Sequence, residues 1–176
     1  AVAEKAEEMM KELRAAGITV RFDNRDTHKP GWKFNEYELK GVPVRIGIGP
    51  RDIENGTLEI ARRDLLTKET VKADTAVTYI QNVLEEMQTG LFDRALKYRE
   101  EHTTKVDSYE EFKEVLDVKG GFVVAHWDGT AETEALIQEE TKATIRCIPL
   151  DAEEEEGVCI RTGKPSARRV VFARAY

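Results

Sequence analysis

The stretch from Pro30 to Asp52 carries side chains whose types could recognise a nucleic-acid base. Its aromatic residues, Phe34 among them, offer flat apolar faces on which an unpaired base can stack. The carboxylate of Glu38 can accept hydrogen bonds from the N1–H and N2–H₂ groups of guanine, and Arg45 and Lys68 can donate to its O6 and N7 atoms. These residue types would suit a single-stranded nucleic acid as the ligand, with guanine as the matching base.

The same residues also have an ordinary structural interpretation. Aromatic side chains on a short helix commonly pack into a core, which would bury Trp32 or Tyr37. Glu36 and Lys40 stand four residues apart, as in a common ion pair on a helix surface. The chemistry of the residues alone favours this structural interpretation over base recognition.

Motifs for catalysis are absent from the sequence. It contains no glycine-rich phosphate loop, no Gly-x-Ser-x-Gly turn and no His-Glu-x-x-His helix. The three histidines, His28, His102 and His126, are scattered along the chain. We therefore expect no independent catalytic activity and no cofactor in this chain.

Composition and charge describe a globular chain with a basic segment. Of the 176 residues, 40% are hydrophobic and 35% are charged, and only two are cysteines, which argues against a disulfide framework and for a reducing, cytoplasmic setting. The sequence contains no run of about 18 apolar residues, which a membrane-spanning helix would need. The net charge is −7, yet residues 21–72 hold eleven Lys and Arg against nine Asp and Glu. That segment is the part of the chain best suited to an anionic partner.

Periodicity and capping signals predict alternating helices and strands. Helices are expected at residues 2–16, 32–40, 75–101, 108–116 and 133–141. Strands are expected at residues 18–22, 42–48, 57–62, 69–72, 122–126, 143–149 and 169–175. This alternation predicts an α/β fold in two domains, 1–101 and 102–176. The chain opens directly in a helix, so either the fold begins with a helix or a preceding strand lies outside this sequence.

Several motifs together resemble the anticodon-binding domain of prolyl-tRNA synthetases, in the form shared by archaea, eukaryotes and some bacteria. The motifs are Asp23-Asn-Arg-Asp26, Pro30-Gly-Trp-Lys-Phe34, Glu36-Tyr-Glu-Leu-Lys-Gly-Val-Pro-Val-Arg45 and Gly49-Pro-Arg-Asp52. Further matches occur at residues 91–95, 137–141, 146–149 and 170–176. The resemblance covers nearly the whole chain.

The resemblance implies a fold and a role. The fold is a class IIa anticodon-binding domain, with a mixed sheet between helices, followed by a small α+β domain. The role is recognition of the two guanines of proline anticodons in tRNA(Pro), through Phe34, Glu38, Arg45 and Lys68. The parent enzyme would be a proline–tRNA ligase that uses ATP and Mg²⁺, acts as a homodimer and carries its catalytic domain elsewhere in the same chain. Two alternatives are a free-standing RNA-binding or regulatory module and an interaction domain without an RNA partner.

The second domain departs from the family pattern at its zinc site. Many relatives bind a structural zinc there through four cysteines, and the matching positions here are Trp127, Glu132 or Thr133, Cys159 and Thr162. A structural zinc site needs Cys or His at each of its four corners, so we predict that this degenerate site binds no metal. The domain is then held by its core, for which we expect Phe122, Val124, Ile145, Ile148, Val171 and Phe172. The resemblance also places the carboxylate of Tyr176 towards the catalytic domain.

Overall fold

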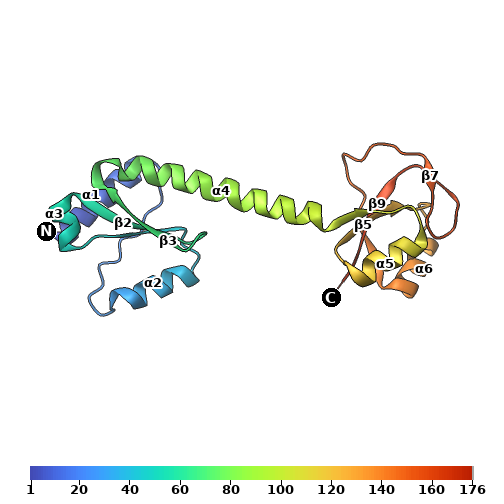
Figure 1. Ribbon diagram of the computed structural model, residues 1–176, viewed down its shortest axis with the longest axis horizontal. Coiled ribbons are helices and arrows are strands. Elements are labelled where there is room, and N and C mark those ends of the chain that lie inside the picture. Colours follow the sequence, from blue (N-terminus) through green and yellow to red (C-terminus); the bar gives the residue numbers. More distant parts are fainter. Residues whose placement is uncertain (176) are drawn as a thin grey trace. The chain divides into compact units, whose positions relative to one another are not determined.

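The computed structural model describes residues 1–175 and confirms the α/β class (Figure 1). The chain divides into two compact units at residues 93 and 94, within the long helix α4 (Ala76–Glu101). The expected domain ranges 1–101 and 102–176 stay a prediction. Tyr176 and any strand upstream of Ala1 lie outside the described residues.

The first unit is a three-stranded antiparallel sheet with helices on both faces. The sheet has the order β1 (Val44–Gly47), β2 (Thr57–Arg62), β3 (Thr67–Lys72). Figure 1 shows α1 (Val2–Ala15) and α4 on one side of it and α2 (Pro30–Leu39) on the other. A short helix, α3 (Pro50–Asn55), joins β1 to β2, and a 3-10 turn, η1 (Ala73–Thr75), leads into α4.

The core of the first unit lies between the sheet and the two helices α1 and α4. Its buried members are Met9, Leu13, Leu58, Ile60, Ala76 and Ile80. Leu58 and Ile60 alternate along β2 and therefore share one face, which leaves the opposite face of the strand for α2 and for polar residues. The candidate site lies on this opposite face of the sheet, which α2 covers.

Two expectations for the first unit are corrected. Residues 18–22 form no strand, because Ile18 and Val20 pack against the core while their backbone pairs with no other strand among the described residues. The expected mixed sheet is antiparallel throughout in this unit, since β1, β2 and β3 follow one another through short connections that reverse the chain.

The second unit contains the mixed sheet. Its strands are ordered β4 (Thr103–Lys105), β5 (Phe122–His126), β9 (Arg169–Arg174), β6 (Ala143–Cys147). Only β4 and β5 pair in parallel. Helices α5 (Tyr109–Val118) and α6 (Ala131–Thr141) pack on the sheet, and a small hairpin, β7 (Gly157–Val158) with β8 (Pro165–Ser166), precedes β9. The predicted cap is confirmed, because the Ser108 hydroxyl accepts a hydrogen bond from the Glu111 amide at 3.2 Å.

The predicted core of the second unit is wrong by one residue in β5. Val123 and Ala125 are fully buried, whereas Phe122 is 39% exposed and Val124 is only partly buried. Phe122 to Ala125 is continuously apolar, so alternation could not show which side chains point inwards. Pairing decides it, since Val123 lies opposite the buried Phe172 in β9 and opposed residues share a face.

The remaining core residues follow from the same sheet. Val170, and not the expected Val171, is buried in the core. Ile145 is partly buried at the margin of the core, and Ile148 lies beyond the end of β6 and is 45% exposed. The buried cluster comprises Val106, Phe112, Leu116, Val123, Ala125, Ile137, Ala143, Val170 and Phe172. No helix among the described residues has both the length and the apolar character needed to cross a membrane.

Candidate nucleic-acid interface

Strand register brings three charged residues together on the outer face of the first sheet. Arg45 in β1 lies opposite Ala61 in β2, and Ala61 lies opposite Lys68 in β3. Glu59 precedes Ala61 by two residues, so its side chain leaves β2 on the same face. The face therefore carries a cation on each of the two outer strands and a carboxylate on the strand between them.

Phe34 covers this group from helix α2. The guanidinium carbon of Arg45 lies 3.6 Å from the centre of the Phe34 ring, and the Lys68 ammonium lies 6.0 Å from it. Cations at such distances are attracted by the ring face. The Arg45 side chain is only 15% exposed as a result. Its charge is thus held in place by an aromatic ring rather than by a fully formed salt bridge.

Two carboxylates lie close to these cations, but neither forms a hydrogen bond with Arg45. Glu38 and Glu59 each place an oxygen 3.9 Å from a terminal nitrogen of Arg45, and Glu59 lies 3.3 Å from the Lys68 ammonium. A distance of 3.9 Å is too long for a hydrogen bond. The Nη1 atom of Arg45 is shielded from solvent and has no hydrogen-bond partner. Leaving a buried donor of this kind unpaired is costly, so this nitrogen is an exception that a binding role for Arg45 would explain.

The predicted residues Phe34, Glu38, Arg45 and Lys68 therefore meet in one place, and their role in binding a ligand stays a prediction. Sequence reasoning missed Glu59. Its position between the apolar residues of β2 indicates an outward side chain, but its nearness to Lys68 depends on the register between strands.

Helix α2 is fixed over the sheet by charged contacts from the preceding loop. Arg25 donates hydrogen bonds of 2.6 Å to both Asp23 and Glu36, which ties the loop to the helix. The Arg25 guanidinium holds the pKa of Asp23 well below its usual range. The pKa of Glu36 is also lowered, first by its hydrogen bond from Lys40 and then by that from Arg25. At the other end of α2, Arg63 donates to the carbonyl oxygen of Glu38 at 2.9 Å.

The aromatic residues of α2 differ from the core interpretation. Trp32 is 48% exposed, and its ring lies 3.9 Å from that of His28 and 5.4 Å from the Arg25 guanidinium carbon. Tyr37 is partly buried, and its hydroxyl has no hydrogen-bond partner. Trp32 faces solvent because the inner side of this helix is taken by Phe34 and Tyr37.

A hollow of about 750 Å³ borders the site on the side of α1. Mainly apolar side chains from α1, residues 18–24, α2 and β1 line it. Phe34 and Arg45 reach it, but Glu38, Glu59 and Lys68 do not. The charged end of the site therefore lies outside the lining of the hollow.

The family's zinc positions in the second unit do not fit a zinc ion. The hydroxyls of Thr133 and Thr162 donate to one oxygen of Asp128, at 2.8 and 2.9 Å. The Trp127 indole N–H donates to the Thr130 carbonyl oxygen at 3.0 Å, and Cys159 is the one thiol of the set. Indole and hydroxyl groups engaged in this way are not zinc ligands. The absence of zinc stays a prediction from this donor chemistry.

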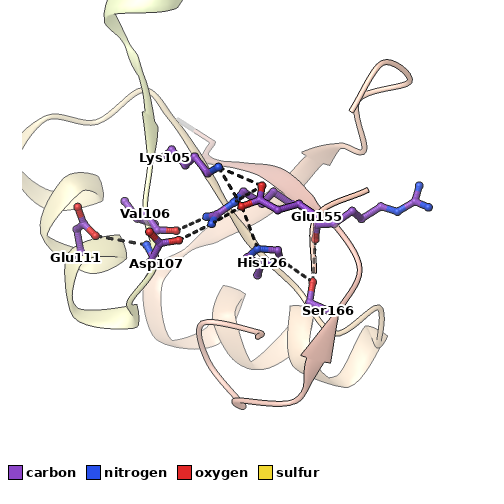
Figure 2. A network of polar contacts seen from close by, with 9 residues as sticks. Lys105, Val106, Asp107, Glu111, His126, Glu155 and Ser166 are labelled. Atoms are coloured by element: carbon purple, nitrogen blue, oxygen red, sulfur yellow. Dashed lines mark hydrogen bonds and ion pairs between the residues drawn. The ribbon is translucent and has the colours of Figure 1, made fainter. Parts of the chain in front are cut away.

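A second polar cluster ties the acidic loop to the sheet of the second unit (Figure 2). The Glu155 carboxylate accepts hydrogen bonds from Arg169 at 3.0 Å and from Lys105 at 3.1 Å, and it lies 3.8 Å from the His126 ring. The Arg169 bond, followed by that from Lys105, lowers the pKa of Glu155 to about 2. A side-chain carbon at Gly157 would collide with the His126 ring, so the loop approaches closely only with glycine there.

The same cluster includes a serine and a histidine beside the glutamate. The His126 and Ser166 side chains share a hydrogen bond of 3.0 Å, and both residues are buried. The Ser166 hydroxyl donates to the carbonyl oxygen of Arg168 at 2.9 Å. The Ser166 hydroxyl is therefore engaged both by His126 and by the Arg168 carbonyl, as expected of a buried structural polar group.

Comparison with known proteins gives consistent matches over both units. A family model described as an anticodon binding domain matches residues 1–83, and one described as the carboxyl-terminal domain of prolyl-tRNA synthetase matches residues 109–176. The chain is 60% identical over 169 residues to a proline–tRNA ligase of Flavobacterium johnsoniae, covering 96% of this chain and 34% of the relative. It is 60% identical over 173 residues to one of Porphyromonas gingivalis (98% and 35%) and 57% identical over 175 residues to one of Christiangramia forsetii (99% and 36%). The chain thus spans about a third of the length of these relatives.

Proposed function

We propose that the chain is part of a prolyl-tRNA synthetase, because it matches an anticodon binding domain and the carboxyl-terminal domain of that family, and that its first unit reads the anticodon of tRNA(Pro). The observation that carries the proposal is the meeting of Phe34, Glu38, Arg45 and Lys68 on one face of the sheet. A base beside Phe34 would find a carboxylate for its N1–H and N2–H₂ groups and cationic donors for O6 and N7. Guanine alone among the four bases presents that combination.

The proposal extends to the parent protein. We infer that this chain serves a proline–tRNA ligase whose ATP- and Mg²⁺-dependent chemistry resides in a catalytic domain of the same chain, and that the parent is a homodimer in the cytoplasm. The relatives compared are named proline–tRNA ligases, which supports this. They are bacterial, so this chain would be a bacterial example of the synthetase form shared with archaea and eukaryotes.

Replacing Glu38 by Gln in the full-length enzyme tests the assignment. The change keeps the shape of the side chain but removes the charge and one acceptor. The value of kcat/KM for tRNA(Pro) should therefore fall, by a factor that corresponds to about 1–3 kcal/mol of lost transition-state stabilisation. The measurement is aminoacylation of tRNA(Pro) and of tRNAs in which either anticodon guanine is replaced by adenine. The variant should discriminate less between guanine and adenine than the unmodified enzyme.

Glu85→Gln is the matched control, because Glu85 is exposed on α4, on the other side of the sheet. It should leave kcat/KM unchanged. If Glu38→Gln also leaves the discrimination unchanged in a folded enzyme, Glu38 is a surface residue without a role in reading the anticodon. Discrimination that is absent from the unmodified enzyme itself would favour a regulatory RNA-binding module.

A further inference from the structure

We propose that Glu59 is a second guanine-reading carboxylate of this site, so that each of the two anticodon guanines meets its own carboxylate and its own cation. The inference rests on the proposed function and deepens it. It starts from stoichiometry. The Watson–Crick edge of one guanine carries two donors, N1–H and N2–H₂, which together occupy both oxygens of one carboxylate. A site that reads two guanines in this way needs two carboxylates, and Glu38 is one of them.

Glu59 is the second carboxylate that faces the same cations. It lies 3.3 Å from Lys68, while Glu38 lies 3.9 Å from Arg45, which gives two carboxylate–cation pairs. The two pairs are joined, since Glu59 is also 3.9 Å from Arg45. All the groups that a second guanine requires are therefore present beside the first set.

The exposure of the groups favours ligand binding over a closed salt bridge. The side chains of Glu38, Glu59 and Lys68 are 51%, 40% and 54% exposed, so their charged ends can be approached. The residues opposite Glu59 are Gly47 in β1 and Thr70 in β3, both small. A side-chain carbon at Gly47 would lie 3.7 Å from a Glu59 oxygen. Glycine at this position keeps that side of the carboxylate open.

The balance of charge identifies the ligand as base edges rather than phosphate. Two carboxylates and two cations cancel, so the cluster offers no net attraction to a phosphate group. It presents alternating donors and acceptors instead, which match the mixed edge of guanine. A phosphate site would lack the two carboxylates.

A cycle of protein and tRNA substitutions tests the assignment in the full-length synthetase. Inosine lacks only the N2 amino group of guanine, so replacing one anticodon guanine at a time by inosine removes one donor. The unmodified enzyme should lose roughly 5- to 30-fold in kcat/KM at each substituted position. Glu59→Gln should lower kcat/KM for the normal tRNA by a similar factor and become insensitive to inosine at one of the two positions. Glu38→Gln should become insensitive at the other position.

Three other results are informative. If Glu59→Gln stays fully sensitive to inosine at both positions while Glu38→Gln loses sensitivity at one, Glu59 only holds Arg45 and Lys68 in place and this inference is overturned, whereas the proposed function stands. If neither variant changes its sensitivity, the proposed function fails as well. If Glu38→Gln alone loses sensitivity at both positions, one carboxylate serves both guanines and the inference is again overturned. Glu85→Gln is the control for both, and thermal unfolding of each variant checks that it is folded.

Discussion

Arg45 is the residue on which the proposed site depends most. It is 15% exposed, stacks on Phe34 and faces two carboxylates at 3.9 Å, while one of its terminal nitrogens has no hydrogen-bond partner. A planar guanidinium can stack and donate along its edge at the same time, which an ammonium group cannot do. The residue therefore combines a fixed position with a donor nitrogen that the protein itself does not pair, as expected of a group that binds a ligand.

Replacing Arg45 by Lys should separate the contribution of the positive charge from that of the planar guanidinium group. The substitution keeps the positive charge but loses the stacked plane and the fork of donors, so kcat/KM for tRNA(Pro) should fall about 5- to 30-fold, or about 1–2 kcal/mol. The measurement is aminoacylation by the full-length enzyme. Arg51→Lys serves as control, since Arg51 is exposed. An Arg45→Lys enzyme as active as the unmodified one would mean that charge alone matters here.

At the scale of elements, each unit uses polar contacts to fix a segment that the sheet alone would not hold. In the first unit, Arg25 joins the loop at Asp23 to helix α2 and so places Phe34 over the sheet. In the second unit, Glu155 joins the acidic loop to β9 through Arg169. Both arrangements depend on ionised carboxylates, so both are sensitive to acid.

The Glu155 contact predicts a loss of stability in acid. Its pKa is about 2 in the folded protein against an ordinary value of 4.5, so the ionised form is favoured by folding. The resulting stabilisation is fully present above about pH 4.5 and is lost as the pH falls towards 2. Hydrogen exchange of the β9 amides in the full-length protein, corrected for intrinsic rates, should show protection that declines over this range.

The Glu155→Gln variant supplies the comparison. It should have less protection than the unmodified protein near neutral pH and a flatter decline between pH 4.5 and 2. Glu154→Gln is the control, because the Glu154 side chain is 87% exposed and its nearest cation, Arg168, is 4.0 Å away. A decline just as steep in Glu155→Gln would show that other carboxylates cause it.

At the scale of the molecule, the chain holds two separate cores. The cluster around Ile60 and Ile80 belongs to the first unit, and the cluster around Phe112 and Phe172 belongs to the second. In the second unit the two phenylalanine rings meet edge to face, with centres 5.2 Å apart. Because no residue belongs to both clusters, we expect each unit to respond to its own core substitutions.

Phe112→Ala tests this separation. Removing a fully buried ring should lower the stability of the second unit by about 3–5 kcal/mol. Hydrogen exchange should show lost protection in β5, β6 and β9, with β2 unchanged. Val118→Ala on the same helix is the control, since Val118 is 82% exposed and its loss should cost less than about 0.5 kcal/mol. Equal loss of protection in β2 would show that the two units unfold as one.

The amino-acid sequence by itself determined the long helices and most of the strands, and it named four candidate site residues. Caps and periodicity are local properties, so Ser108, which begins α5, could be identified from its neighbours along the chain. Phe34, Glu38 and Arg45 could be named as candidates because they lie in the family motif, and Lys68 because its residue type suits the same chemistry. The tertiary structure decided what depends on pairing and packing. The inward phase of β5, the exposure of Trp32 and the place of Glu59 beside Lys68 follow from strand register and from which helix covers which face, and contacts between distant residues set both.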